Sequence, residues 1–572
     1  MKIFSNVIFL FFISFSLFSQ NLLISKPYPE DYFRAPLDLP PSLAGSFGEI
    51  RSNHFHSGLD YRTNQREGYP VHAAADGYVS RLRVQVGGFG NAIYITHPNG
   101  YTTVYAHLKR FNPKIEQFVK NFQYANQSFD VDFILFPIDI LIKKGEVIAW
   151  SGNTGSSGGP HLHFEIRDSK TEQTINPQLF GLQVPDKVKP TITGMYMYRL
   201  NGLPFNEHTP KQYFQVIGSG GNYKLNKLPV INFSGEVGFG IMTQDQNVPG
   251  GNQNGVYSIE LLLDGTTIYA SALEGFYFNN SRAVNSHLDY SSLLLYGRRI
   301  QKSFVEPGNP LTIYKNLVNR GLIKLDDSEI HDLTYMVKDA AGNTSKLSFQ
   351  IRNNPKAELK SAEESTGVTT FYYDRDNTYT DEDLRILIPK GILYSDLQLK
   401  YSKSAKPVRG FSPVHHIHTR LIPVHDNYTL SIKADSSLSA DLQEKAVIVD
   451  TRGFNFGGNY ENGFVTTSLK TFGNFYISID TIAPRIRSVN VSEGKSFSDT
   501  ERMVFKISDN LSGIRSFNGT IDGQWILMEF DPKTATLWHT FDERTSKGKH
   551  QFQLTVTDMK LNTTTYHATI YR

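Results

Sequence analysis

The sequence contains no cysteine, only 8 methionines and 3 tryptophans, and nearly equal numbers of positive and negative side chains. The absence of cysteine excludes disulfide bonds, thiolate catalysis, cysteine-bound metals and lipid attachment at an N-terminal cysteine. A formal net charge of +3 over 572 residues provides no basic footprint, so we expect no nucleic-acid partner. Any metal site must therefore be built from histidine and carboxylate side chains.

Long apolar runs are also scarce. One lies at residues 7–18, after Lys2 and before Ser19 and Gln20. A short apolar run behind a basic start is typical of a secretory signal peptide, whereas a membrane span needs about 20 apolar residues. We predict a signal peptide at residues 1–20 and no stable membrane span after its cleavage. The protein is then exported to the periplasm, the cell envelope or the medium, and an uncleaved anchor is the alternative.

Glycine and aromatic residues are abundant, with 45 Gly, 30 Tyr and 39 Phe, and they occur in short alternating stretches. This composition favours strands over helices, and the length requires several domains. We predict an all-β fold that begins with a Pro-rich arm at residues 21–42 and an antiparallel β-sheet domain at residues 43–184. The expected strands in this domain lie at residues 71–79, 92–97, 102–107, 147–151 and 161–167.

One helix interrupts this β pattern. Ile115, Phe118, Val119 and Phe122 have the spacing of one helical face, and Pro113 suits a first helical turn. The sequence therefore predicts a single inserted helix over residues 113–127.

A weak internal repeat marks the C-terminal half. The segment at residues 186–192 resembles the segment at residues 480–486. Proline at an edge strand and an Asp-to-Asn turn are typical of immunoglobulin-like β-sandwiches. We predict such sandwiches at residues 185–355, with an insertion, and at residues 481–572, separated by a strand-rich middle domain at residues 356–480. The turn aspartates are Asp339, followed by Asn343, and Asp558, followed by Asn562; we favour turn formation for them, with calcium binding as the alternative.

Three histidine-bearing segments in the first domain have the pattern of a metal site. His161 and His163 are two residues apart, so a strand would present both on one face. His56 and Asp60 are separated by a stretch that contains Gly58 and can reach one ion. Two histidines and one carboxylate suit a catalytic zinc ion with a position left for water, although the same set can bind non-haem iron.

The order of these segments resembles that of the lysostaphin/LytM-type zinc endopeptidases, which cleave peptide cross-links in bacterial peptidoglycan. The resemblance covers residues 43–181. It rests on residues 47–51, the His56-x3-Asp60 motif, residues 70–77, the segment around His107 at residues 105–108, and residues 152–165 with His161 and His163.

The resemblance implies that His56, Asp60 and His163 hold one Zn²⁺ ion. It places His107 and His161 beside the attacking water and the scissile carbonyl, and it leaves open which of them is the principal base. The implied substrates are stem or bridge peptides of peptidoglycan. The stretch at residues 109–142 is longer than the family's minimal domain, so we expect its helix to form one wall of the substrate groove. Protein partners could bind the C-terminal β-domains.

Three alternatives stay open at this point. A catalytically silent protein of the same fold could bind the wall or activate another hydrolase. An iron oxygenase is disfavoured by the surplus histidines and the motif spacing, and an adhesin would act through its β-sandwiches. The remaining histidines are predicted to pack or to lie at the surface: His54, His72, His97, His415, His416 and His418.

Overall fold

The computed structural model describes residues 23–227, 230–357, 367–498 and 501–572. These residues form mostly β-strands, which confirms the prediction of an all-β fold. The predicted signal peptide lies outside the described residues. Within the described ranges, no helix is both long and apolar enough to cross a membrane.

The first domain is built on an antiparallel sheet with β13 (His161–Asp168) near its centre. The order along this sheet is β1 (Leu43–Gly45), β4 (Leu59–Arg62), β13, β8 (Tyr101–Ala106), β7 (Ala92–Thr96), β6 (Gly77–Val84) and β10 (Val131–Ile134), with β11 (Leu141–Ile142) beside β6 and β14 (Thr174–Ile175) beside β13. Two smaller sheets flank it: β5 (Pro70–His72), β12 (Val147–Trp150) and β9 (Arg110–Phe111), and the pair β2 (Ile50–Arg51) and β3 (His54–Phe55).

The prediction of one strand over residues 71–79 is wrong. The chain leaves the small sheet after β5, turns at residues 73–76 and enters the large sheet as β6. The side chain of Asp76 in this turn accepts a hydrogen bond from the backbone N–H of Lys144 at 2.7 Å, which connects the turn to the segment between β11 and β12. Periodicity could not reveal the break, since Ala73, Ala74 and Ala75 are buried like strand residues.

The inserted helix α1 (Pro113–Asn126) matches the sequence prediction. The Asn112 side chain caps it by accepting the N–H of Ile115. Ile115 and Val119 are buried, whereas Phe122 is partly exposed and stacks on Phe133 with ring centroids 4.1 Å apart.

Residues 191–353 contain two further sheets. One consists of β16 (Lys211–Phe214), β15 (Thr191–Arg199), β20 (Glu236–Gln244) and β24 (Gln301–Lys302), with β26 (Ile323–Lys324) beside β20. The other consists of β17 (Val216–Ser219), β18 (Asn222–Leu225), β28 (Thr344–Asn353), β27 (Ile330–Lys338), β21 (Ser258–Leu263), β22 (Thr266–Ala272) and β25 (Tyr314–Leu317), with β19 (Val230–Phe233) beside β28.

A segment between β22 and β24 belongs structurally to the first domain as well. Its strand β23 (Gly275–Phe276) pairs with β14 and so extends the first sheet. The short helices α2 (Phe278–Ser281), α3 (Val284–His287) and α4 (Tyr290–Tyr296) follow. The hydroxyl of Ser281 accepts the N–H of Phe55 at 2.8 Å, which fixes α2 beside the residue that precedes His56.

The last third of the chain forms four main sheets and one strand pair. Residues 369–479 contain the pair β29 (Thr369–Phe371) and β32 (Leu397–Leu399), the sheet β30 (Asn377–Thr380), β31 (Leu384–Ile388), β35 (Tyr428–Lys433), β38 (Phe464–Leu469) and β37 (Asn459–Glu461), and the sheet β33 (Tyr401–Ser404), β34 (Val414–Ile417), β39 (Gly473–Ile479) and β36 (Ala446–Asp450). Residues 485–571 contain the sheet β40 (Arg485–Ser488), β42 (Arg502–Ser508), β46 (Thr536–Thr540) and β45 (Glu529–Asp531), and the sheet β41 (Lys495–Ser496), β48 (Thr563–Tyr571), β47 (Lys549–Asp558), β43 (Ile514–Ile521) and β44 (Gln524–Ile526).

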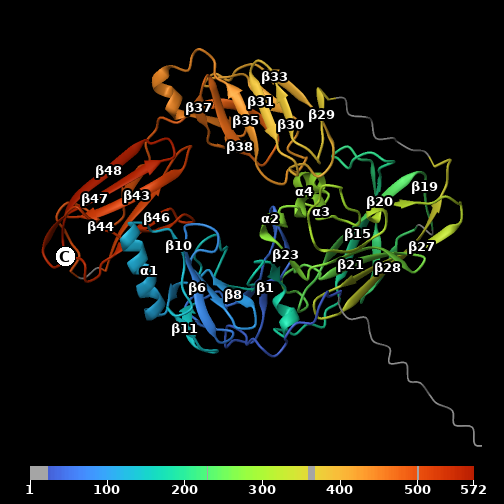
Figure 1. The fold of residues 1–572 in the computed structure, drawn as a ribbon, viewed down its shortest axis with the longest axis horizontal. Helices are drawn as coiled ribbons and strands as arrows, with labels where there is room; N and C mark the ends of the chain where they lie inside the picture. Colours follow the sequence, from blue (N-terminus) through green and yellow to red (C-terminus); the bar gives the residue numbers. More distant parts are fainter. Residues whose placement is uncertain (1–22, 228–229, 358–366, 499–500) are drawn as a thin grey trace, which may run out of the picture.

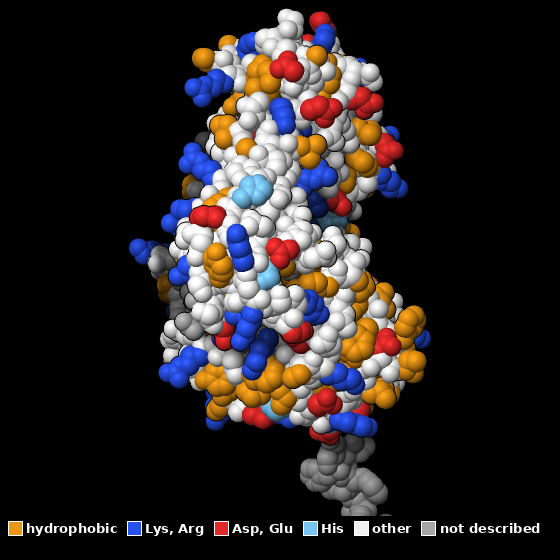
Figure 2. Space-filling view, turned by 90° about the vertical axis from the view of Figure 1, so that its left-hand side faces the viewer, with side chains coloured by type: hydrophobic (Ala, Val, Ile, Leu, Met, Phe, Trp, Pro, Cys, Tyr) orange, Lys and Arg blue, Asp and Glu red, His pale blue; other side chains and the backbone are white. Residues whose placement is uncertain are grey.

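The successive units follow one another around a ring, which the C-terminal unit closes against α1 (Figure 1). Tyr124 of α1 packs edge-on against Trp525, with ring centroids 5.1 Å apart. Lys120 lies 3.5 Å from Asp542, and the Lys533 ammonium donates to the backbone carbonyl of Asn153. On the outer face shown in Figure 2, basic and acidic side chains are intermixed.

Candidate metal centre

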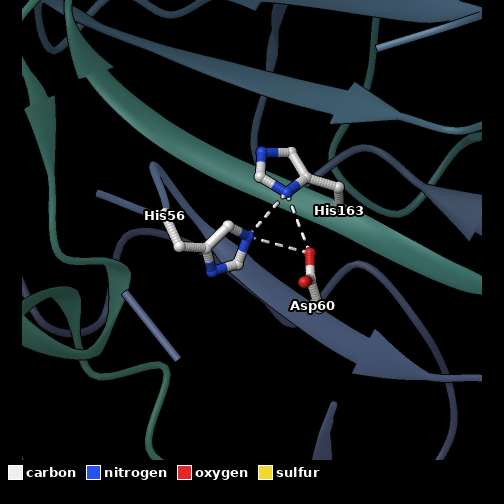
Figure 3. A group of neighbouring side chains, drawn as sticks. All are labelled: His56, Asp60 and His163. Carbon is white, nitrogen blue, oxygen red and sulfur yellow. Dashed lines mark hydrogen bonds and ion pairs between the residues drawn. The ribbon is translucent and has the colours of Figure 1, made fainter. Parts of the chain in front are cut away.

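Strand pairing brings together the residues that the sequence separates by about a hundred positions. Asp60 on β4 lies directly opposite His163 on β13, and His56 enters from the turn between β3 and β4. His107 follows β8, the neighbour of β13 on its other side. The pairing of β4 with β13 therefore assembles His56, Asp60 and His163, and His107 approaches from the other side of β13 (Figure 3 shows the first three).

The three side chains point one atom each at a common position. The His56 Nε2 to Asp60 Oδ1 distance is 3.0 Å, the His163 Nδ1 to Asp60 Oδ1 distance is 2.9 Å, and the two ring nitrogens are 3.0 Å apart. A tetrahedral zinc ion with ligands at about 2.0–2.1 Å holds them about 3.3 Å apart. The set is thus close to the size and donor chemistry that a zinc ion requires.

The outer ring nitrogens are already engaged. Nδ1 of His56 donates to the backbone carbonyl of Ser46 at 2.7 Å, and Nε2 of His163 donates to Glu165 Oε1 at 2.9 Å. Because carbonyl and carboxylate oxygens only accept, each partner places a hydrogen on the outer nitrogen. The lone pair of the inner nitrogen is then available for a metal, as is usual for metal-binding histidines.

The charge of the site is balanced by buried groups. Burial opposes ionisation of Asp60, but His56, His161 and His163 around it hold the pKa of its carboxyl well below the usual value. Arg51 adds a charged hydrogen bond to the other oxygen of Asp60 at 2.7 Å. In the metal-free site, Asp60 and Glu165 overcome the opposing effect of burial and raise the pKa of His163 to about 9.

Glu165 is a functional candidate that the sequence argument did not single out. It is fully buried; Ser57 donates to the same oxygen, Oε1, that His163 contacts, and Arg167 binds the other oxygen, Oε2. The signal was present in the sequence, because His163 and Glu165 are two residues apart and therefore share a face of β13. Glu165 orients His163, while Ser46 does the same for His56 through a backbone carbonyl that no side-chain motif could reveal.

His107 and His161 lie beside the three-residue set. Their ring centroids are 4.9 Å apart. Their Nδ1 atoms donate to the carbonyls of Thr154 at 2.9 Å and Gly159 at 2.8 Å, respectively. Nε2 of His161 is buried, makes no hydrogen bond within the described part of the chain, and lies 3.3 Å from Asp60 Oδ1. Burial, followed by the neighbouring imidazoles, lowers the pKa of His107 to about 3, so this ring is neutral near pH 7.

The other histidines serve local structure. His54 is exposed and bonds to the carbonyl of Ser52. His97 is buried between the carbonyl of Asp76 and the hydroxyl of Thr103, and His415 bonds to the Tyr401 hydroxyl.

Comparisons with known proteins relate the first domain to peptidases. Residues 54–125 match the model of peptidase family M23, and residues 368–480 match the model of a Zu5-like domain. The chain is 37% identical over 131 residues to the DD-carboxypeptidase/endopeptidase Mpg of Neisseria meningitidis, which is 23% of this chain and 24% of that protein. It is 32% identical over 143 residues to the peptidoglycan DD-endopeptidase ShyC of Vibrio cholerae, or 24% of this chain and 26% of that protein.

Among solved structures, the catalytic domain of lysostaphin from Staphylococcus simulans has 23% sequence identity and a TM-score of 0.18, covering 25% of this chain and 93% of that domain. The chain matches only about a quarter of the length of its curated relatives. The resemblance to lysostaphin/LytM-type peptidases is confirmed by the match of residues 54–125 to the peptidase M23 model and by the peptidoglycan endopeptidases among the relatives.

Proposed function

We propose that the protein is an exported, zinc-dependent metalloendopeptidase that hydrolyses peptide cross-links of bacterial peptidoglycan. The main support is the convergence of the inner atoms of His56, Asp60 and His163 beside two further imidazoles. We assign these three residues as zinc ligands and His107 and His161 as the catalytic residues.

The donor set fits zinc rather than a hard alkaline-earth ion. Two neutral imidazoles and one carboxylate are the nitrogen and oxygen donors that catalytic zinc sites use. When bound, a zinc ion polarises the scissile carbonyl and lowers the pKa of water, which makes a nucleophile available near neutral pH. His56, Asp60 and His163 position this chemistry at the edge of β4 and β13.

His107 and His161 handle protons in this scheme. Both rings carry a hydrogen on Nδ1, because each Nδ1 faces a carbonyl, and Nε2 of a neutral ring is then a proton acceptor. One imidazole accepts the proton of the attacking water. An imidazole then donates to the oxyanion or to the leaving amine.

The substrate class is proposed from the relatives, whose names include a DD-carboxypeptidase/endopeptidase and a peptidoglycan DD-endopeptidase. A signal peptide at residues 1–20 would bring the enzyme to that substrate. We also propose that α1 forms one wall of the substrate groove, that residues 43–184, 185–355, 356–480 and 481–572 are domains, and that the C-terminal β-domains offer sites for protein partners.

Purified full-length protein loaded with zinc should release soluble muropeptides from isolated sacculi. Defined cross-linked muropeptides, weighed after digestion, identify the bond that is cut. Stoichiometric zinc binding with no product from either substrate would contradict hydrolysis and favour a silent regulator of the same fold.

A further inference from the structure

A second cluster of potential ligands lies outside the candidate zinc centre. It consists of Asp186, which precedes β15, Asp245, which follows β20, and Asp339, which follows β27. One carboxylate oxygen from each lies within 4.8 Å of the others. Asp245 is 4% exposed and Asp339 is 2% exposed, so charges of one sign meet in the interior.

Two oxygens at this cluster are buried and have no hydrogen-bond partner in the part of the chain that the structure describes. They are Oδ1 of Asp245 and Oδ1 of Asn254, whose residue is 6% exposed. The orientation of Asn254 follows from its neighbours: the side-chain NH₂ group of Asn247 donates to Asp186, and the NH₂ group of Asn254 donates to the side-chain oxygen of Asn247. An acceptor is therefore left over on Asn254 as well as on Asp245.

The unpartnered residues border a small cavity. Its volume is about 20 Å³, and its lining includes Asp186, Asp245, Asn254 and Tyr257. A space of this size holds a single water-sized particle. Ser46 and Phe47 of the first domain close its other side.

The cluster lacks a compensating positive charge from the protein. Within the described ranges, no lysine, arginine or histidine forms an ion pair with any of the three aspartates. Burial, reinforced by the neighbouring aspartates, raises the pKa of Asp245 to about 8 and that of Asp339 to about 6. Buried carboxylates in this arrangement must take up a proton or a cation.

We propose that Asp186, Asp245, Asp339 and Asn254 bind a calcium ion at the junction of the first β-sandwich and the peptidase domain. All four donors are oxygens, which hard cations prefer. Calcium tolerates an irregular set of carboxylate and amide oxygens, whereas magnesium demands near-octahedral geometry and keeps several waters.

The site lies where the first β-sandwich contacts the peptidase domain, so an ion bound there would have a structural role. Ser46 contributes to the cavity wall, and its hydroxyl accepts the N–H of Gly255 in the sandwich at 3.1 Å. The carbonyl of the same Ser46 accepts the Nδ1 hydrogen of His56. Calcium therefore stabilises the contact between the two domains at the residue that orients His56. This assignment does not depend on the proposed hydrolysis.

The C-terminal sandwich contains a matched cluster made of Asp480, Asp509 and Asp558. Asp480 and Asp509 accept backbone N–H groups from Ser512 and Gly513. This cluster also lies near an ammonium group, since Asp480 and Asp558 act on the Lys560 charge. Among the described residues, Oδ1 of Asp509 is buried without a hydrogen-bond partner, as is Oδ1 of Asp245, so the nearby Lys560 charge is what distinguishes this cluster, and it serves as an internal control.

The test uses the full-length, zinc-loaded protein in calcium-free buffer. Calcium added up to about 10 mM should raise the Tm by several degrees, since extracellular sites bind with Kd values on the order of 10⁻⁴–10⁻³ M. Terbium, used as a calcium probe, should luminesce on excitation of tyrosine, because Tyr257 lines the cavity. Asp245→Asn should abolish both responses, and Asp509→Asn should retain them.

Asp245→Asn keeps the shape of the side chain and removes a repelled charge, so it should fold. Asp186→Asn tests the proposal with an independent variant and should also abolish both responses. Equal responses in the wild type and Asp245→Asn would overturn the proposal, as would the absence of any response in the wild type. A magnesium response as large as that to calcium would contradict the choice of ion.

Discussion

Two clusters in this protein place ionisable side chains close together, away from water, and differ in how their charge is compensated. One consists of His56, Asp60 and His163, and the other consists of Asp186, Asp245 and Asp339. Both are groups of three that join segments far apart in the sequence, and all of their members are buried except the half-buried Asp186. The first combines two imidazoles with one carboxylate, and Arg51 and Arg167 lie next to the carboxylates of Asp60 and Glu165. The second contains only oxygens and no paired cation among the described residues. Donor chemistry thus directs the first toward zinc and the second toward calcium.

The two clusters also differ in how their donors are held. In the first, Ser46 and Glu165 fix the outer nitrogens of His56 and His163, so the inner nitrogens are presented in one orientation. In the second, Asp339 accepts hydrogen bonds from the N–H groups of Asn343, but Oδ1 of Asp245 has no partner among the described residues. A preorganised site suits catalysis. At an uncompensated site, binding of the ion should instead increase the stability of the folded protein.

The largest effect is expected for His163→Ala, which should remove zinc and activity together. Its imidazole supplies one of the converging atoms, so muropeptide release should fall on the order of a thousandfold or become undetectable. Zinc content by metal analysis and product release from sacculi check this outcome. The exposed His54 is the matched control: His54→Ala should retain both, and retained zinc in His163→Ala would contradict its assignment as a ligand.

His107→Ala should separate chemistry from metal binding. Since its ring lies beside the ligand set and its Nδ1 is held by Thr154, the variant should keep stoichiometric zinc while turnover falls about 10²–10⁴-fold. The same measurements on His161→Ala rank the two imidazoles as proton acceptors. Loss of zinc in His107→Ala would show that its role has been assigned incorrectly.

Glu165→Gln should weaken zinc binding about 10–100-fold without abolishing it, because the amide oxygen can still orient His163 but carries no charge.

Zinc binding should also release a proton, since the metal-free wild type holds His163 protonated below a pKa of about 9. Affinity therefore falls as pH drops below this value. Titration calorimetry in buffers of different ionisation enthalpy measures the proton; no release at pH 7 in the wild type would contradict the arrangement.

The smallest effect is expected for the calcium-free stability of Asp245→Asn. The carboxyl of Asp245 has a pKa near 8 in the folded chain, above its ordinary value of 3.8. Ionisation therefore favours the unfolded chain, and wild-type stability should decline as pH rises from about 4 to about 8. The variant should show a shallower decline and a Tm a few degrees higher at pH 7. Parallel pH profiles would contradict the raised pKa.

Local sequence signals predicted local structure well. Pro113 and the spacing of Ile115 and Val119 lie within a few residues, and α1 begins where they indicate. The helices α2, α3 and α4 were not predicted, because they are short and hold their places through contacts such as that between Ser281 and Phe55. The break between β5 and β6 was missed for a similar reason, since the burial of Ala73–Ala75 depends on which sheet each strand joins.

The internal repeat was visible in the sequence as isolated pairs, and its meaning emerged from three-dimensional contacts. Asn343 bonds to Asp339 and to the carbonyl of Asp186, and Asn562 bonds in the same way to Asp558 and to the carbonyl of Asp480. The prediction that these aspartates form turns is consistent with these bonds. The buried acceptors beside Ser46, Oδ1 of Asp245 and Oδ1 of Asn254, belong to residues that no repeat unit pointed to.

The sequence by itself determined the residue types and spacings from which a zinc site can be built: His56 four residues before Asp60, and His161 and His163 on one strand face. It could do so because these relations are short and follow from backbone geometry. Only the tertiary structure decided that Glu165 and Ser46 orient the ligands, and that three distant aspartates meet without a counter-charge. Burial and the energy of close charges depend on which segments become neighbours in space, and strand pairing over more than a hundred residues sets that.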